Sequence, residues 1–349
     1  MRKSIIFFLL AFFVLPASVH AQGQVKLQDG APDRYIVEKG DTLWGIAGKF
    51  LKDPWRWQDV WRLNQDQIKN PHRIYPGDVI VLDRSKSPPQ LAMAPVSAER
   101  LSPRVRVENL AAEAIPSIPP KAIEPFLTQP LVIEEGGLER APRIVGTQEG
   151  SVYLGAGGVA YASGMGDSKE PNWQLFKPGR PLVDPDSGRM LGVEAIYLGT
   201  ARLLRSGEPA TVQIVSSTQE ISAGDRLLPA GPMTINQYAP HTPKSAISSR
   251  IIGIVGGLAN SEGGRNSIVS INKGSLQGLE KGHVLALVRT GRTVPDPQSS
   301  VSRDTAPKLR LPDERYGLAF VFRVFGNVSY ALVMDSSRPV APGDFLLAP

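Results

Sequence analysis

The sequence predicts a multidomain chain with a small α+β unit, a proline-rich linker and a mainly-β C-terminal region of two tandem β modules. Three observations lead to this prediction. Residues 34–83 carry a strand–helix–helix–strand pattern, and residues 84–130 hold nine prolines with almost no aromatic side chains. From there to residue 349, short runs of Val, Ile and Leu alternate with Gly and Pro, which is typical of β structure.

The first 21 residues have the features of a secretory signal peptide. Arg2-Lys3 precedes an apolar run from Ile5 to Leu15, and Val19-His20-Ala21 supplies small residues for cleavage. Such a run is too short to span a bilayer, which takes about 20 residues. We expect cleavage after Ala21, export to the periplasm or cell envelope, and no transmembrane segment afterwards. An uncleaved N-terminal anchor is the alternative.

The next element, residues 34–83, is predicted to be a compact βααβ unit. Residues 34–37 alternate apolar and polar side chains, as in a half-buried strand. Asp41 or Thr42 is placed to cap a helix, whose apolar stripe recurs at helical spacing. The stripe consists of Leu43, Ile46, Ala47 and Phe50. Asp53-Pro54 begins a second helix, and Pro76-Gly77-Asp78 turns the chain into a closing strand at 79–82.

This unit closely resembles the LysM domain, a small module that binds peptidoglycan and chitin. More than a dozen positions match in order, over about one seventh of the chain. The matching residues are Tyr35, Val37, Gly40-Asp41-Thr42-Leu43-Trp44, Ile46-Ala47, Asn64, Asn70-Pro71, Ile74, Pro76-Gly77 and Ile80. The segment from Lys52 to Trp57 is longer and richer in tryptophan than in the commonest version of the module.

The resemblance implies a shallow sugar-binding groove between two loops. One side is formed by Gly40, Asp41, Thr42 and Leu43, and the other by Asn70, Pro71 and Ile74. Backbone groups near Gly40 are suited to pair with the amides of N-acetylated sugars, while Leu43 and Ile74 are expected to cover the acetyl methyl groups. The alternative is that Asp41 and Thr42 only cap the helix and that Ile74 only packs.

Four of the five tryptophans lie in this unit. Trp57 and Trp61 are four residues apart on the second predicted helix, which assigns them to the core. Trp44 and Trp55 lie off the apolar stripes. We expect these two to be exposed, as possible platforms for stacking on a sugar ring.

The β region contains an internal repeat. Residues 212–228 resemble residues 331–347 at an offset of 119 with no gap. Both segments end in Gly-Asp-x-Leu-Leu, a pattern that predicts a turn followed by a strand. Upstream, Lys177-Pro178-Gly179 is aligned with Lys281-Gly282. Two modules are therefore predicted, at 131–235 and 247–349, the second with a mobile loop from Thr290 to Leu311. The Gly-Asp turns are expected to be structural.

No catalytic or metal-binding pattern emerges from the sequence. There is no cysteine, and after signal cleavage the histidines are His72, His241 and His283, far apart and outside any HExxH or nucleophile-elbow motif. The glycine-rich segments do not have phosphate-loop spacing. We therefore expect no catalytic residue, no metal, no cofactor and no enzymatic activity.

The charge is modest. Loss of Arg2 and Lys3 with the signal peptide lowers the formal net charge from +6 to +4. This suits an anionic wall polymer or membrane surface, and without a basic cluster it argues against nucleic acid.

The sequence thus predicts a non-catalytic, exported protein that binds peptidoglycan glycan strands through one module. Its β region is expected to meet an envelope protein partner. Two alternatives remain. One is a peptidoglycan-remodelling hydrolase with an unrecognised active site in the β region. The other is an envelope scaffold or adaptor in which wall binding serves only to localise the protein.

Overall fold

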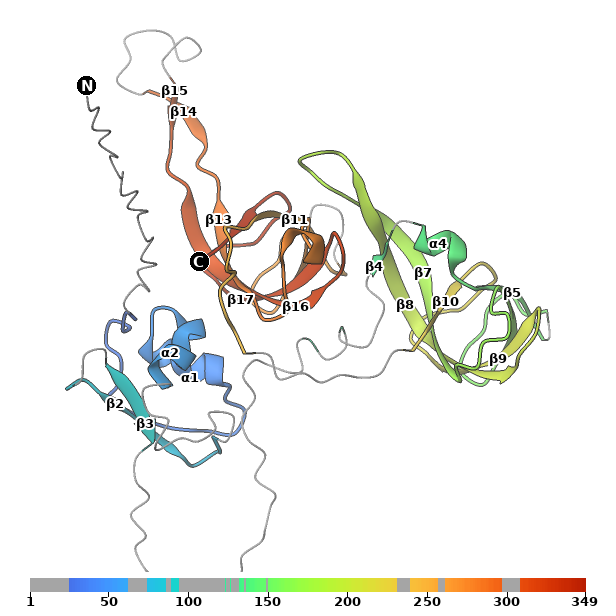
Figure 1. Cartoon of the computed structure of the whole chain (residues 1–349), viewed down its shortest axis with the longest axis horizontal. Helices are drawn as coiled ribbons and strands as arrows, with labels where there is room; N and C mark the ends of the chain where they lie inside the picture. Colours follow the sequence, from blue (N-terminus) through green and yellow to red (C-terminus); the bar gives the residue numbers. More distant parts are fainter. Residues whose placement is uncertain are drawn as a thin grey trace, which may run out of the picture.

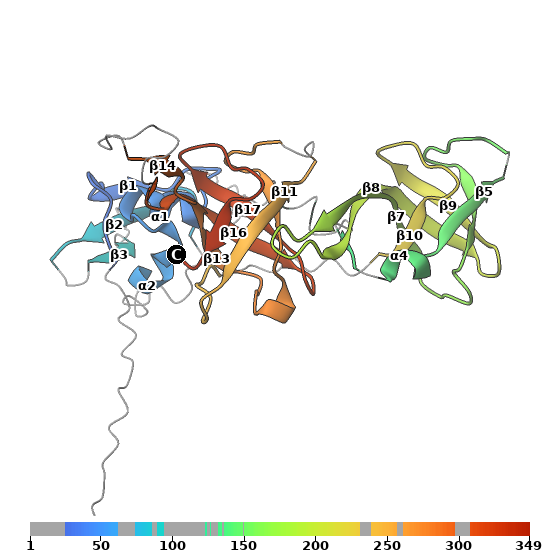
Figure 2. The same ribbon diagram turned by 90° about the horizontal axis from the view of Figure 1, so that it is seen from above.

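The computed structural model shows a small α+β domain and two rings of β-strands (Figure 1; Figure 2). It describes residues 25–61, 74–85, 89–93, 123, 126, 132–134, 136–148, 150–230, 239–256, 261–296 and 308–349. We call the strands between residues 143 and 229 the first ring, and those between residues 248 and 347 the second ring.

The N-terminal domain pairs three antiparallel strands in the order β1-β2-β3, beside its helices. Its elements are β1 (Arg34–Ile36), α1 (Leu43–Phe50), the 3-10 turn η1 (Pro54–Arg56), α2 (Trp57–Trp61), β2 (Val79–Asp83) and β3 (Gln90–Met93). The predicted apolar stripe of α1 is buried in the core together with Trp57 and Ile80. Of the two candidate caps, Thr42 fills the role: its Oγ1 accepts from the Gly45 N–H at 3.0 Å.

Strand β3 was not predicted, because residues 84–130 were assigned to the linker. It pairs with β2 from Ile80↔Met93 to Asp83↔Gln90. Leu91 is fully buried in the domain core, which explains why the chain turns back instead of leaving. The strand lies at the edge of the sheet, where Pro89 just before it is tolerated.

The first ring contains six strands that close on themselves. They are β5 (Arg143–Thr147), β6 (Val159–Ser163), β7 (Asn172–Val183), β8 (Met190–Arg205), β9 (Ala210–Ser217) and β10 (Arg226–Pro229). The pairings run β5-β6-β9-β8-β7-β10, and the Arg226↔Arg143 pair returns β10 to β5. A short strand β4 (Val132–Ile133) adds to β8, and helix α4 (Gly137–Arg140) precedes β5.

The second ring is a closed barrel in the order β11-β12-β17-β16-β13-β18. Its strands are β11 (Ser248–Ile254), β12 (Ile268–Ile271), β13 (Val284–Arg289), β16 (Glu314–Val324), β17 (Ser329–Ser336) and β18 (Phe345–Leu347), with the 3-10 turn η3 (Ser275–Gln277). Within the loop predicted at 290–311, β14 (Thr293–Pro295) pairs with β15 (Lys308–Arg310).

The two rings share one strand order when β5, β6, β7, β8, β9 and β10 are matched with β11, β12, β13, β16, β17 and β18. The 119-residue offset holds for the starts of the last two strand pairs, β9 with β17 and β10 with β18. Turn hydrogen bonds recur as well: Gly224 N–H donates to Ile144 O and Gly343 N–H donates to Ile251 O, both at 2.8 Å.

The upstream half of the predicted alignment is wrong. Strand β10 sets Arg226 opposite Phe176, and β18 sets Phe345 opposite Val288. Phe176 therefore corresponds to Val288, and Lys177 to Arg289. Lys281-Gly282, which the sequence aligned with Lys177-Pro178-Gly179, lies before β13 in the turn that leads into it.

A long hairpin formed by β7 and β8 joins the two rings. Arg250 of the second ring pairs with Asp186 at 2.7 Å, and Asn272 Nδ2 donates to Asp184 Oδ1 at 2.6 Å. Leu182 and Leu191, at the far end of the hairpin, are buried in an apolar cluster with side chains of the second ring. The hairpin therefore fixes the first ring to the second by both polar and apolar contacts.

The second ring is buried on both faces, which is unusual for an antiparallel barrel. Along β16, Ala319 and Val321 belong to the interior cluster, whereas Leu318, Phe320 and Phe322 belong to an outer one. That outer cluster also contains Trp44 of the N-terminal domain and Ile123 from the predicted linker. The second ring is thus the hub against which the other parts of the chain pack.

The N-terminal domain lies beside the second ring in both views (Figure 1; Figure 2). Asp53 Oδ1 accepts from Arg315 Nη2 at 3.1 Å, which ties η1 to the base of β16. In this arrangement the N-terminal domain is held against the barrel and does not move freely at the end of a tether.

No helix among the described residues is both long enough and apolar enough to cross a membrane.

Candidate functional site

The loop between β1 and α1 is held in shape by Asp41. Its Oδ2 accepts from the Glu38 N–H at 2.8 Å and from the Tyr35 hydroxyl at 3.0 Å. Gly40 has φ of +100°, a left-handed conformation that favours glycine. Residues 38–40 are exposed, so this loop offers a fixed backbone edge to the solvent.

The loop before β2 is tied directly to the end of β1. Val37 donates its N–H to Asp78 O and accepts from Gly77 N–H, both at 2.8 Å. Asp78 Oδ2 in turn accepts from the Tyr75 N–H at 2.9 Å. These bonds bring the loop that holds Gly40 and Asp41 next to the loop that holds Ile74, as the resemblance implied. Asn70 and Pro71 lie outside the described residues.

Two predicted apolar walls of the groove are not on the surface. Leu43 and Ile74 are both fully buried in the core of the domain. They support the two loops from below, and the expectation that they cover the acetyl groups of a sugar is wrong for this arrangement. Among the described residues of the two loops, the accessible groups are therefore mainly backbone and polar.

The expectation that Trp44 is exposed is also wrong. Its side chain is 4% exposed and belongs to the outer apolar cluster of the second ring. Trp55 is half-buried at the margin of the same cluster, and its indole N–H has no hydrogen-bond partner among the described residues. The indole groups of both tryptophans therefore lie at the interface between the N-terminal domain and the second ring, where they cover apolar side chains of the barrel.

A cation lies close to the groove. The ammonium of Lys49 is 3.9 Å from the centre of the Tyr35 ring. A hydrogen bond with Tyr35 raises the pKa of Lys49 above its usual value, which keeps it charged. The edge of the site next to β1 thus carries a fixed aromatic ring under a positive charge.

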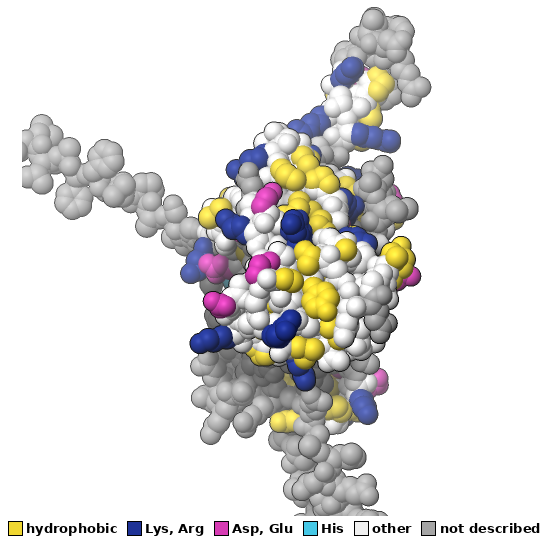
Figure 3. Space-filling view, turned by 90° about the vertical axis from the view of Figure 1, so that its right-hand side faces the viewer, with side chains coloured by type: hydrophobic (Ala, Val, Ile, Leu, Met, Phe, Trp, Pro, Cys, Tyr) yellow, Lys and Arg dark blue, Asp and Glu magenta, His cyan; other side chains and the backbone are white. Residues whose placement is uncertain are grey.

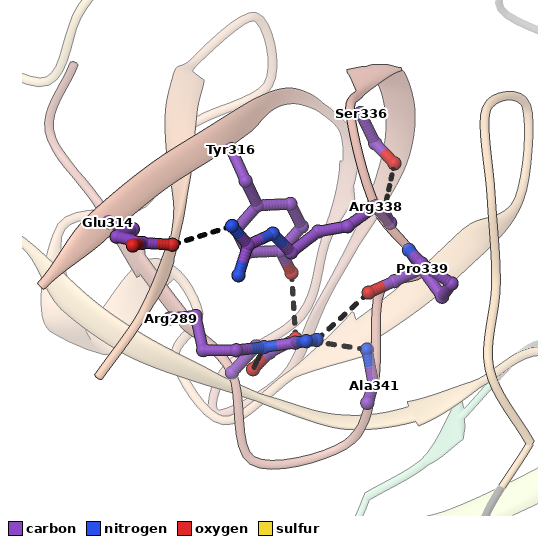
Figure 4. Close-up of polar contacts among 8 residues, drawn as sticks. Arg289, Glu314, Tyr316, Ser336, Arg338, Pro339 and Ala341 are labelled. Carbon is purple, nitrogen blue, oxygen red and sulfur yellow. Dashed lines mark hydrogen bonds and ion pairs between the residues drawn. The ribbon is translucent and has the colours of Figure 1, made fainter. Parts of the chain in front are cut away.

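A second polar cluster lies inside the rim of the second ring (Figure 4). Asp344 accepts from Arg289 at 2.9 Å and from the Tyr316 hydroxyl at 2.7 Å. Burial would raise the pKa of Asp344, but the bonds from Arg289 and Tyr316 outweigh it and hold this pKa below its usual value. Burial, with the bond to Asp344, raises the pKa of Tyr316. A charged, fully bonded carboxylate of this kind is structural.

Arg338 closes this cluster from outside. Its Nη2 donates to Glu314 Oε2, and its guanidinium lies 5.9 Å from the centre of the Tyr316 ring. A shallow pocket of about 430 Å³ opens beside it, lined by Glu262, Gly263, Gly264, Arg265, Ser336, Ser337, Arg338 and Pro339. Among the described residues that line the pocket, Glu262 is the one carboxylate and none is a histidine.

Two histidines that the sequence left apart meet in the structure. His241, from the segment between the rings, has its ring centre 4.8 Å from that of His283, which precedes β13. His283 is 3% exposed, and burial and the neighbouring His241 lower its pKa, which favours the neutral ring. Sequence reasoning placed His241 in a solvated loop. A separation of 42 positions forms no motif, so no local signal marked this pair.

The first ring exposes apolar side chains that nothing in the described chain covers. Figure 3 shows hydrophobic groups gathered near the middle of this face, with Lys and Arg around them. The exposed large hydrophobic residues between positions 143 and 229 are Val145, Val152, Tyr153, Val183, Met190, Ile196, Leu204 and Val215. The two rings therefore differ in how much of the outer side is covered. Other parts of the chain cover the second ring, whereas β4 and α4 cover the first around Phe176 and Ala195 and leave the residues named above exposed.

The comparisons with known proteins agree with the geometry of the N-terminal domain. Residues 35–83 match the LysM domain family, so this segment is a LysM domain. The chain is also similar to an uncharacterized protein, YqbP, of Bacillus subtilis (strain 168), with 43% identity over 56 residues. That match covers 14% of this chain and 26% of YqbP, so the chain spans about a quarter of that relative. A LysM domain indicates carbohydrate or peptidoglycan binding, and such domains are common in cell-envelope proteins.

Proposed function

We propose that the protein is a non-catalytic, exported peptidoglycan-binding protein whose LysM domain is held on a β-rich body. The observation that carries the proposal is the match of residues 35–83 to the LysM domain, together with the loops that this domain presents. The ligand class is a glycan strand containing N-acetylglucosamine, and the location is the periplasm or cell envelope.

Binding would rest on backbone groups more than on apolar walls. The exposed loop at residues 38–40 is fixed by Asp41, and Leu43 and Ile74 are not accessible. N–H and C=O groups in a fixed loop pair well with the amide of an N-acetylated sugar, because a loop that is already ordered loses less conformational entropy on binding. Asp41 is then a positioning residue for the groove.

The β region is proposed to consist of two copies of one module. Their shared strand order and the recurring turn bonds support this. The exposed apolar side chains of the first ring support an envelope protein as its partner, because single modules that bind glycan weakly gain from a second attachment. In this proposal the protein recruits or positions that partner at the wall, which joins the binding and adaptor roles.

Co-sedimentation of the full chain with purified peptidoglycan tests the wall-binding claim. The unaltered chain is expected in the pellet, and soluble chito-oligosaccharide is expected to release it. Asp41→Ala frees the Glu38 amide and the Tyr35 hydroxyl, so we expect several-fold weaker binding. Asp29→Ala, at an exposed acid on the same domain, is the matched control and should bind normally. A soluble unaltered chain would refute the proposal.

Gel zymography tests the claim that the protein is not an enzyme. The purified chain is expected to leave a peptidoglycan-containing gel opaque. A cleared band that persists in a preparation free of contaminating hydrolases would favour the hydrolase alternative instead.

A further inference from the structure

His241, Glu280 and His283 come together on one fixed piece of backbone. His241 donates its N–H to Gly282 O at 2.9 Å, and Val284 donates its N–H to His241 O at 2.8 Å. These two bonds lay the segment between the rings alongside the start of β13. One potential ligand atom from each of the three side chains lies within 4.8 Å of the others.

We propose that His241, Glu280 and His283 bind a divalent transition-metal ion of the zinc class. Imidazole nitrogen and carboxylate oxygen are the ligands that zinc prefers where thiolates are absent, and this chain has no cysteine. Two histidines with one carboxylate leave a further coordination position for water. The site lies in the β region, so it is independent of glycan binding.

His241 is already oriented as a metal ligand. Its Nδ1 lies 3.0 Å from Ala239 O, a distance at which Nδ1–H donates to that carbonyl. The proton on Nδ1 leaves the lone pair of Nε2 free, and metal-binding histidines are usually held by a bond of this kind. Glu280 is exposed, so an ion reaches its carboxylate from solvent.

His283 has to exchange one contact to bind the ion. Its Nδ1 accepts from the Glu280 N–H at 3.1 Å, which leaves the proton on Nε2. A turn of the ring about the Cβ–Cγ bond releases this lone pair for the ion and keeps the number of protons unchanged. One neutral hydrogen bond is small beside the free energy that metal ligation supplies.

The ion would tie the segment that carries His241 to the second ring. His241 belongs to the connection that leaves the first ring, whereas Glu280 and His283 belong to the second. Binding therefore adds a link between the connecting segment and the barrel. Because the ion binds only the folded arrangement, it should raise the unfolding temperature, and above its Kd this rise should grow with the logarithm of the ion concentration.

Isothermal titration of the chelator-treated full chain with zinc chloride tests this site. We expect one ion per chain and a higher Tm with zinc, but not with magnesium. His241→Gln and Glu280→Gln should each weaken binding by at least about tenfold, in line with the loss of a ligand. Glu220→Gln, at an exposed glutamate of the first ring, is the matched control.

Cobalt provides a second measurement that does not depend on stability. The visible absorption of the bound Co²⁺ should appear in the unaltered chain and fade in His241→Gln. The proposal is overturned if zinc does not bind at millimolar concentration. It is overturned equally if both ligand variants bind zinc as tightly as the unaltered chain, or if magnesium raises Tm as much.

Discussion

Asp225 and Asp344 hold the same turn in two different rings, 119 residues apart. The carboxylate of Asp225 accepts from the Ser222 N–H at 2.7 Å, and that of Asp344 accepts from the Ala341 N–H at 3.1 Å. Both side chains are buried, and each follows a glycine with a positive φ. Asp78 makes the same bond to Tyr75 in the LysM domain. Asp41 makes it to Glu38 after Gly40, so the Gly-Asp pattern is one turn that occurs four times among the described residues. These bonds agree with the prediction that the Gly-Asp turns of the β region are structural.

The two aspartates have different surroundings, and this predicts an acid-sensitive second ring. The Arg289 and Tyr316 bonds keep the pKa of Asp344 below its usual value in the folded chain. A depressed folded pKa adds stability above the unfolded pKa of about 3.9, and this stability is lost as pH falls through the folded value. The free energy of unfolding, measured by urea denaturation, should therefore fall below about pH 4.

Asp344→Asn should remove that part of the acid sensitivity. At pH 7 it should also lower the free energy of unfolding by about 1–3 kcal/mol, because Arg289 and Tyr316 lose a charged acceptor. Asp335→Asn, at an exposed acid on β17, serves as control. An unchanged pH profile in Asp344→Asn would show that another group sets the acid limit.

Replacing Gly199 or Gly317 by alanine should destabilise the fold. They occupy matching positions in β8 and β16, where an added Cβ would overlap the carbonyl oxygen of Ser216 or Asp335. Each Gly→Ala change should cost about 1–3 kcal/mol or more, measured by urea denaturation. Gly146→Ala and Gly264→Ala place the same methyl group in open space and should change stability by less than about 0.5 kcal/mol. Equal costs in the two sets would contradict the ring register.

Trp44 should be needed to hold the LysM domain on the barrel. Because the chain lacks cysteine, Asp53→Cys with Arg315→Cys gives a specific pair for a short bismaleimide cross-linker. Adding Trp44→Ala should slow this cross-link by removing apolar contact at the interface. The corresponding pair at Asp186 and Arg250 spans the rings, and Trp44→Ala should leave its rate unchanged.

Leu91 should stabilise the LysM domain although it lies beyond the matched family segment. It is fully buried on β3, so Leu91→Ala should cost about 2–5 kcal/mol. Tryptophan fluorescence reports this domain, because four of the five tryptophans belong to it. Leu309→Ala, at a half-exposed leucine of β15, is the comparison and should have little effect. If both substitutions changed the free energy of unfolding by the same small amount, β3 would not contribute to the stability of the LysM domain.

Local signals made the LysM domain and its turns predictable. Thr42 caps α1 and Gly40 takes its left-handed φ for reasons that lie within a few residues of each. The downstream half of the repeat was found for the same reason, because Gly-Asp marks a turn of fixed shape. Upstream, β7 and β13 match in apolar side chains and in one basic residue, Lys177 with Arg289, and none of these marks a turn. Their register is shown by their cross-strand partners, which the sequence does not contain.

The errors arose where distant parts of the chain meet. Trp44 was expected on the surface because the barrel that buries it is encoded more than 200 residues later. Leu91 was assigned to a linker because Pro88 and Pro89 dominated its surroundings. His241 and His283 share a site only because a backbone ladder joins the two segments. In each case burial was decided by tertiary packing, which local patterns do not contain.

The ion pair between Asp53 and Arg315 joins residues 262 positions apart, and this separation has a consequence for biogenesis. If the chain is translocated from its N-terminus, the LysM domain emerges and folds long before the barrel that covers Trp44 exists. Closing so large a loop is slow compared with folding a small domain. Every new molecule would then pass through a period in which the domain meets the wall unrestrained, and only later becomes seated on its own barrel.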